Sequence, residues 1–247
     1  MFRFKQFTIQ QDRTAMKVCT DACVLGAWAQ IEAGTYLLDI GTGTGLLALM
    51  AAQRNPNAQI DAVELDEAAA QQAADNVAAS PFADRITVHQ SAIQQFYPPS
   101  AVSPSPLRYD HILTNPPFYV NSLRSPDKAV NRALHTDELP FADLLVAVRR
   151  LLAPTGTWWV LLPPPEMAVL RQLAAAGSPT LVPVTELHLR HHDQKPVFRQ
   201  LVGFRFTDSS GNVPGPVNPA ILAIYEPDGR TYTAQFRALL QPYYLIF

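Results

Sequence analysis

Apolar and polar positions along the chain alternate between short strand-like runs and longer segments with helical spacing. Continuous apolar runs bounded by turn residues predict strands, and apolar positions that recur every three to four residues predict helices. The predicted strands cover 36–40, 59–64, 85–89, 109–114 and 157–162. The predicted helices cover 46–53, 67–79, 141–152 and 165–176. This alternation predicts an α/β fold with a doubly wound, mostly parallel sheet.

The pattern changes after the last of these helices. Two long strand candidates, 181–189 and 199–206, follow each other with no helix between them, which predicts an antiparallel hairpin at the edge of the sheet. The tail adds a predicted strand at 221–225 and an amphipathic helix at 232–240. The whole chain therefore reads as one domain with a small extension.

Composition narrows the class of protein. With 247 residues, 48% of them hydrophobic and 16% charged, the chain can bury a large core and is not disordered. A net charge of -2 gives no global attraction to nucleic acid, so any such contact needs a local basic patch. Cys19 and Cys23 predict reduced thiols and no disulfide framework. We expect no signal peptide and no membrane span, and hence a cytoplasmic protein.

The turn after the first predicted core strand, Asp39-Ile40-Gly41-Thr42-Gly43-Thr44-Gly45, is rich in glycine. Glycines at Gly41, Gly43 and Gly45 permit a tight turn and a close approach of the backbone to a ligand. Glu64 ends the next strand, at the carboxyl edge where open α/β sheets bind ligands, and can accept both hydroxyls of a ribose. These features predict a nucleotide-like cofactor, and by themselves they leave NAD and S-adenosylmethionine open. Asp39 faces the cofactor or caps the loop and helix.

The tetrapeptide Asn115-Pro116-Pro117-Phe118 follows the strand at 109–114. An exocyclic amine on an aromatic base is a poor nucleophile, because its lone pair is delocalised into the ring. The side-chain oxygen of Asn115 and the carbonyl of Pro116 can accept its two hydrogens and so localise that lone pair. The prolines restrict the backbone, and Phe118 offers a face for stacking a planar group. The tetrapeptide therefore predicts methylation of an amino group.

These motifs resemble those of a known family. The Asn-Pro-Pro-aromatic motif is similar to that of class I, S-adenosylmethionine-dependent methyltransferases that act on adenine N6, cytosine N4 or glutamine amide. The segments 4–7, 12–18, 20–21 and 25–29, with 46–50, 61–65, 114–119 and the tail from 227 to 245, resemble the tRNA1(Val) adenine-N6 methyltransferase family. The resemblance covers nearly the whole chain. It implies a Rossmann-like fold and methyl transfer to N6 of the adenosine just 3′ of the anticodon.

The resemblance also implies roles for individual residues and segments. Segment 1–34 would cover the cofactor pocket, 35–208 would form the catalytic core, and 209–247 would be a C-terminal extension. Asn115, Pro116, Pro117 and Phe118 would hold the adenine. The residues expected at the cofactor are Lys17, Thr20, Asp21, Asp39, Gly41, Gly43, Gly45, Glu64 and Ala92.

Two positions depart from the family pattern. Ala92 stands where an acid usually meets the adenine amine of the cofactor, and its side chain cannot accept a hydrogen bond. Ser91 or a backbone group could take over that contact, or the affinity for the cofactor is lower. Phe118 replaces a tyrosine, which keeps the stacking face and removes a hydroxyl.

Two basic stretches could meet the phosphates of a tRNA, which contribute affinity without sequence information. One follows the tetrapeptide, and the other forms the turn of the predicted hairpin. Their candidate contacts are Tyr119, Arg124, Lys128, Arg132, Arg190, His191, Lys195 and Arg199. We expect no metal site, because no cysteine or carboxylate cluster joins His191 and His192 at ligand spacing. We expect a monomer.

Three alternatives stay open from the sequence. A glutamine-amide methyltransferase uses the same tetrapeptide, but the short segment ahead of the glycine turn does not resemble a separate helical recognition domain. A tRNA-binding module with weakened catalysis is consistent with Ala92. A DNA adenine methyltransferase is disfavoured, because no target-recognition domain is visible after Phe206.

Overall fold

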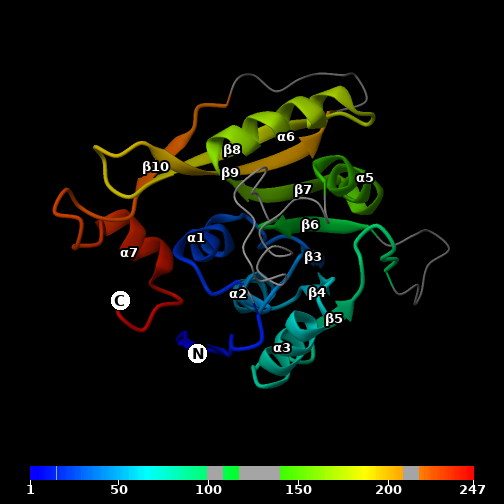
Figure 1. The fold of residues 1–247 in the computed structure, drawn as a ribbon, viewed down its shortest axis with the longest axis horizontal. Helices are drawn as coiled ribbons and strands as arrows, with labels where there is room; N and C mark the ends of the chain where they lie inside the picture. Colours follow the sequence, from blue (N-terminus) through cyan, green and yellow to red (C-terminus); the bar gives the residue numbers. More distant parts are fainter. Residues whose placement is uncertain (15, 99–107, 117–139, 208–216) are drawn as a thin grey trace, which may run out of the picture.

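The structure, a computed structural model, describes residues 1–14, 16–98, 108–116, 140–207 and 217–247. Its main sheet is built from strands that match the predicted ones within two residues at each end, except that β7 begins five residues before the predicted strand 157–162. They are β3 (Tyr36–Ile40), β4 (Gln59–Glu64), β5 (Ile86–Gln90), β6 (Tyr109–Thr114), β7 (Leu152–Leu162), β8 (Leu181–Arg190), β9 (Val197–Phe206) and β10 (Ala220–Ala223). Within the described residues the strand order is β10-β8-β9-β7-β6-β3-β4-β5 (Figure 1).

The direction of the chain reverses at the centre of this sheet. From β3 the chain runs outward through β4 to β5, and then returns to form β6 on the other side of β3. All pairs from β5 to β7 are parallel, as predicted. The carboxyl ends of β3 and β6 therefore meet at a topological switch point, where ligands of open α/β sheets bind.

The hairpin of β8 and β9 is antiparallel, as predicted, but its predicted place at the edge of the sheet is wrong. β9 pairs with both β7 and β8, and the edge is β10, which runs parallel to β8. A strand as short as β10 carries too little pattern to reveal its partner, because its pairing depends on how the tail folds back.

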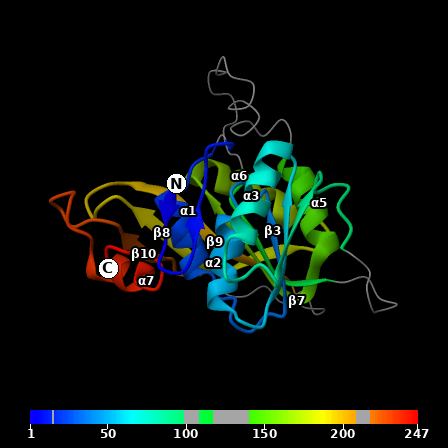
Figure 2. The ribbon, with the colours of Figure 1, turned by 90° about the horizontal axis from the view of Figure 1, so that it is seen from below.

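Helices cover both faces of the sheet. The described helices are α1 (Thr20–Trp28), α2 (Leu46–Arg54), α3 (Glu67–Ala78), α5 (Phe141–Leu151), α6 (Pro164–Ala176) and α7 (Ala234–Leu240). Residues of α1, α2 and α7 share one buried apolar cluster, and residues of α5 and α6 belong to a second. Figures 1 and 2 show α5 and α6 on the side of the strands opposite to α1 and α2. This two-layered covering confirms the doubly wound architecture.

Local chemistry sets several helix boundaries. Asp66 accepts a hydrogen bond from the amide of Ala69 and so caps α3, and Thr233 caps α7 in the same way. Pro164 opens α6 one residue earlier than predicted, because proline is tolerated in a first turn where its missing N–H has no helical partner.

Three elements near the N-terminus had no prediction. The two-residue strands β1 (Phe2–Arg3) and β2 (Thr8–Ile9) pair with each other, and α1 follows them. Seven consecutive residues of α1, Asp21 through Ala27, are buried. A helix enclosed on all sides has no polar face, so it lacks the periodicity by which helices are recognised.

The two ends of the chain pack against each other (Figure 1). The amide of Lys5 donates to the carbonyl of Tyr243 at 2.8 Å, and its ammonium donates to the carbonyl of Phe247 at 2.9 Å. The ring of Tyr244 lies 6.0 Å from that of Phe4. The C-terminal tail thereby fixes the start of the chain beside α1. From there, residues 10–14 and 16–18 run toward the carboxyl edge of the sheet.

Candidate functional site

A cavity of about 310 Å³ opens at the carboxyl ends of β3 and β4. Its volume is in the range of small-molecule sites in proteins. Of the residues predicted for the cofactor, Lys17, Gly41, Gly43, Glu64 and Ala92 line it, and so does Asn115. Ile40, Val63, Leu65 and Ile93 add an apolar wall. The structure thus brings the glycine loop and the start of the tetrapeptide to one cavity.

The glycine loop between β3 and α2 depends on left-handed backbone conformations. Gly43 has a φ of 56° and Gly45 a φ of 83°, which L-residues with a Cβ rarely adopt. A Cβ added at Gly43 would enter open space, so the loop presents bare backbone to the cavity. A Cβ at Gly45 would lie 3.6 Å from that of Ala73, because the loop packs directly on α3.

Glu64 connects this loop to the end of β4. Its Oε2 accepts a hydrogen bond from the amide of Gly43 at 2.8 Å, and its Oε1 accepts from the amide of Asp66 at 3.0 Å. Burial raises the pKa of the Glu64 carboxyl. A carboxylate has about four lone-pair positions, and these contacts do not use all of them, so a hydroxyl donor in the cavity can still be accepted.

Asp39 lies beneath the loop and is fully buried. Its Oδ2 accepts from the hydroxyl of Thr42 at 2.6 Å and from the amide of Ala48, in the first turn of α2, at 3.1 Å. Its Oδ1 has no hydrogen-bond partner. Burial raises the pKa of Asp39 to about 7. One oxygen of Asp39 therefore caps the loop and α2, which is one of the two roles expected from the sequence. The other oxygen is available to a hydrogen-bond donor.

Asn115 lines the cavity and follows β6 immediately. It is half-buried, and its Oδ1 is a buried acceptor with no hydrogen-bond partner. Pro116 beside it is buried. Leaving a buried polar atom unpaired costs free energy, so such atoms in native proteins point to a missing ligand or to strain. The orphaned oxygen lies on the residue that the motif predicts as the acceptor for an amine.

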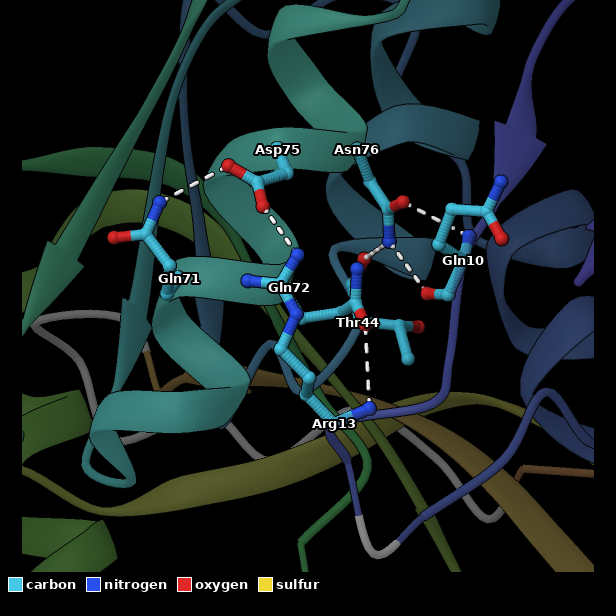
Figure 3. A network of polar contacts seen from close by, with 7 residues as sticks. All are labelled: Gln10, Arg13, Thr44, Gln71, Gln72, Asp75 and Asn76. Carbon is cyan, nitrogen blue, oxygen red and sulfur yellow. Dashed lines mark hydrogen bonds and ion pairs between the residues drawn. The ribbon is translucent and has the colours of Figure 1, made fainter.

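Residues 10–14 and 16–18, here called the N-terminal strap, run across α3 and over the glycine loop. Figure 3 shows the polar contacts that attach the strap to α3. The amide of Gln10 donates to Oδ1 of Asn76 at 2.8 Å, and Nδ2 of Asn76 donates to the carbonyls of Gln10 and Thr44, both at 2.9 Å. One buried side chain therefore ties the strap to the glycine loop.

A second set of contacts attaches the strap to α3, one helical turn closer to the start of that helix. The amide of Arg13 donates to Oε1 of Gln72 at 3.3 Å, and its guanidinium pairs with Asp75 at 2.6 Å (Figure 3). The ammonium of Lys17 donates to the carbonyls of Gln11 and Thr14, which closes the strap on itself. Arg13 and Lys17 both line the cavity.

Some residues predicted at the cofactor do not line the cavity. Thr20 and Asp21 lie in the first turn of α1, and Asp21 forms an ion pair with Arg199 at 2.7 Å. Arg199 had been expected at the substrate, and the structure places it against α1. Asp39 and Gly45 lie behind the cavity wall.

The remaining predicted substrate contacts divide into two groups. Arg190, His191 and Lys195 lie at the turn between β8 and β9. The registers Thr114↔Val160 and Leu162↔Gln200 put this turn on the carboxyl side of the sheet. The other group, Pro117, Phe118, Tyr119, Arg124, Lys128 and Arg132, lies outside the described residues.

Sequence reasoning missed Gln72 and Asn76, which are 1% and 2% exposed. They lie four residues apart and share the buried face of α3 with Ala69 and Ala73. Polar side chains within an apolar helical stripe are a usable signal, because a buried amide needs hydrogen-bond partners. Cys19, Thr14 and Met16 are further lining residues that had no assigned role.

Comparison with known proteins identifies the family. Residues 24–162 match the methyltransferase small domain family. A tRNA1(Val) (adenine(37)-N6)-methyltransferase of Dyadobacter fermentans is 49% identical over 246 residues, which cover 100% of this chain and 98% of the relative. The chain belongs to the tRNA1(Val) (adenine(37)-N6)-methyltransferase family. A member from Pseudoalteromonas translucida is 39% identical over 99% of this chain and 98% of its own. The protein is therefore a methyltransferase, as the tetrapeptide predicts.

Solved structures agree with this family assignment at the level of the fold. A predicted O-methyltransferase from Agrobacterium tumefaciens matches with a TM-score of 0.67 at 15% identity, over 90% of this chain and 96% of that chain. TrmN from Thermus thermophilus matches with a TM-score of 0.52 at 22% identity, over 75% and 48% of the two chains. The expected class I methyltransferase fold of this family is confirmed.

In residues 1–14, 16–98, 108–116, 140–207 and 217–247, no three His, Cys, Asp or Glu side chains gather as a metal-binding group. None of the helices in these ranges combines the length and apolarity needed to cross a membrane.

Proposed function

We propose that the protein transfers a methyl group from S-adenosylmethionine to N6 of the adenosine just 3′ of the anticodon in tRNA1(Val). The observation that carries the proposal is the buried, unpartnered Oδ1 of Asn115, a residue that lines the cavity. Relatives named for this reaction, which match over the full chain, favour it over glutamine-amide methylation and over a non-catalytic binding module.

The cavity suits S-adenosylmethionine. Glu64 lines the cavity with a carboxylate that retains capacity to accept hydrogen bonds, which fits the ribose hydroxyls. The exposed backbone of Gly41 and Gly43 permits close approach of the methionine part. The unpartnered Oδ1 of Asp39 lies behind that part of the cavity and fits a cationic amine reached directly or through water. When bound, the cofactor would supply an electrophilic methyl group on a sulfonium.

The remaining cofactor contacts would be weaker or indirect. Lys17 and Ala92 line the cavity, and Ser91 beside Ala92 offers a hydroxyl. Thr20 and Asp21 would act through α1, and Gly45 through the packing of the loop on α3.

Asn115 would prepare the nucleophile. Its Oδ1 and the Pro116 carbonyl would each accept one hydrogen of the adenine amine, which localises the nitrogen lone pair toward the methyl group. Pro117 and Phe118 would complete the adenine pocket. No strong base is needed, because methyl transfer leaves a cationic nitrogen that loses its proton readily. The target adenosine is unpaired in the anticodon loop, so its extrusion costs little.

The wider assignments belong to the same proposal. We infer a division into a strap segment (1–34), a catalytic core (35–208) and a C-terminal extension (209–247) of one domain. We further infer a monomer that works in the cytoplasm, where its tRNA substrate is modified. The proposed tRNA contacts are Tyr119, Arg124, Lys128, Arg132, Arg190, His191 and Lys195, and Arg199 is left out because it is paired with Asp21 on α1.

The proposal is tested by comparing nucleoside digests of tRNA from cells with and without the gene. Deletion should remove N6-methyladenosine from tRNA1(Val), and purified protein with labelled S-adenosylmethionine should restore it. A transcript with guanosine at the position 3′ of the anticodon is the control and should accept no label. Unchanged N6-methyladenosine after deletion would overturn the assignment.

A further inference from the structure

The turn between β8 and β9 carries two aromatic rings in close parallel contact. The imidazole of His191 and the ring of Phe198 have centroids 4.1 Å apart and an interplanar angle of 6°. His191 is exposed and Phe198 is half-buried. An exposed ring that rests flat on a neighbour presents its other face to solvent with little freedom to rotate. We call these two residues the ring pair.

A bulge in β9 creates the ring pair. The register runs Leu189↔Arg199 and then Arg190↔Val197, so Phe198 has no partner in β8. Regular strands send neighbouring side chains to opposite faces, whereas a bulge re-aims one of them. Phe198 therefore packs on the same core cluster as Leu189.

Other contacts hold the ring pair in place from both sides. The guanidinium of Arg199 lies 5.4 Å from the centre of the Phe198 ring, and its Nε is paired with Asp21 on α1. On the opposite strand, the carbonyl of His191 accepts a hydrogen bond from the amide of Tyr225 at 2.8 Å. The ring pair is therefore anchored to α1 and to the segment after β10, although it lies on a turn.

The ring pair lies on the same side of the sheet as Asn115. Figure 1 shows the β8–β9 turn on the side to which the arrowheads of β6 and β7 point. Two strand spacings across the sheet and about three residues along it separate Phe198 from Asn115, as the registers give. Standard strand geometry makes this roughly 15 Å. A neighbouring nucleotide of the same RNA loop can span such a distance.

We propose that the ring pair is a stacking platform for an unpaired nucleobase next to the methylated adenosine. The proposal rests on the proposed function. Proteins recognise single-stranded RNA loops by stacking splayed bases on aromatic side chains, His among them. A flat exposed ring suits a planar ligand, and the neighbouring Lys195 and Arg190 can meet the phosphates on either side. Neither residue of the pair needs to read a base edge, so this contact adds affinity with little sequence preference.

The test measures methylation of an anticodon stem-loop RNA by His191→Ala, His191→Phe and Phe198→Leu. His191→Ala should raise KM for RNA about 10-fold, the effect of losing one base stack. It should leave kcat and the Kd for S-adenosylmethionine unchanged, which also shows that the variant is folded. His191→Phe should restore KM, because it keeps the ring. Phe198→Leu should raise KM as well, because it removes the support. Gln194→Ala, exposed on the same turn, is the matched control and should match wild type.

Two results would overturn the platform. One is an unchanged KM in His191→Ala. The other is a KM for RNA in His191→Phe that is raised as much as in His191→Ala. If this increase also becomes smaller at high salt, the contact is to a phosphate and not to a base. If wild-type protein methylates no tRNA, the proposed function fails instead. Quenching of 2-aminopurine placed beside the target adenosine then tests the platform by binding alone.

Discussion

The side-chain amide of Asn76 donates to the backbone carbonyl of Thr44 at 2.9 Å while it also holds Gln10 through two hydrogen bonds. A residue of α3 thus joins the N-terminal strap to the glycine loop, although none of its own atoms lines the cavity. Asn76 is in this sense a positioning residue, and the shape of the cofactor cavity depends on it.

Asn76→Ala should weaken binding of S-adenosylmethionine about 10-fold, because the strap and the loop lose a shared anchor worth about one to two hydrogen bonds. Titration calorimetry measures the Kd directly. Glu67→Ala, exposed at the start of the same helix and away from the strap contacts, is the matched control and should bind like wild type. Equal affinities for wild type and Asn76→Ala would show that the strap does not shape the site.

Glu64→Gln should raise the Kd for S-adenosylmethionine by roughly 10- to 100-fold, since hydrogen bonds to a charged acceptor are worth about 1.5–3 kcal/mol. The amide nitrogen cannot accept, so either a ribose hydroxyl or the amide of Gly43 or Asp66 loses its partner. At saturating cofactor kcat should remain near wild type. Glu67→Gln, exposed at the start of α3, controls for the loss of a charge. A drop in kcat alone would contradict a binding role.

Asn115→Ala should reduce kcat by roughly 100-fold or more, the usual cost of losing a preorganised polar contact to the reacting group. Cofactor affinity should stay nearly intact, because the proposed partner of Oδ1 of Asn115, which has none in the protein, is the target amine and not the cofactor. Single-turnover methylation and calorimetry separate the two effects. Loss of cofactor binding in this variant would argue against its role in positioning the amine.

Asp39 should make stability depend on pH. Its pKa is about 7 in the folded protein and 3.8 as the ordinary value, because burial disfavours the charge. Between these values the folded state holds a proton that the unfolded chain has lost, so the free energy of unfolding falls as pH rises from about 4 to 7. Asp39→Asn keeps an acceptor for Thr42 and Ala48 and cannot ionise. Urea unfolding at several pH values should show that the free energy of unfolding of the variant rises relative to that of wild type between about pH 4 and 7. If the two free energies change with pH in parallel, the raised pKa of Asp39 is contradicted.

Ala92→Asp should tighten cofactor binding by roughly 3- to 10-fold, because a carboxylate there could accept a hydrogen bond from the adenine amine. Ala92 lines the cavity, so the new side chain has access to it. Ala92→Ser tests whether a hydroxyl suffices. An unchanged or weaker Kd in Ala92→Asp would mean that Ser91 or a backbone group already serves this contact.

Local sequence patterns determined much of the fold and part of the candidate site. The alternation of apolar runs with segments of helical spacing was enough to predict the core strands and helices. Strands and helices can be told apart because their buried residues recur in the sequence with different periods. The glycine loop and Asn115 could be assigned to one site, since both follow parallel strands and such strands end at the same edge.

Only the tertiary structure decided which distant residues meet. Asp21 pairs with Arg199 across 178 positions, and Asn76 reaches Gln10 and Thr44. No period in the sequence encodes these partners, because periodicity reports which face is buried and not what covers it. The bulge that turns Phe198 onto His191 depends on a one-residue shift between two strands. Such a shift is set by packing against α1 and the tail, and for this reason it is settled only when the whole chain has folded.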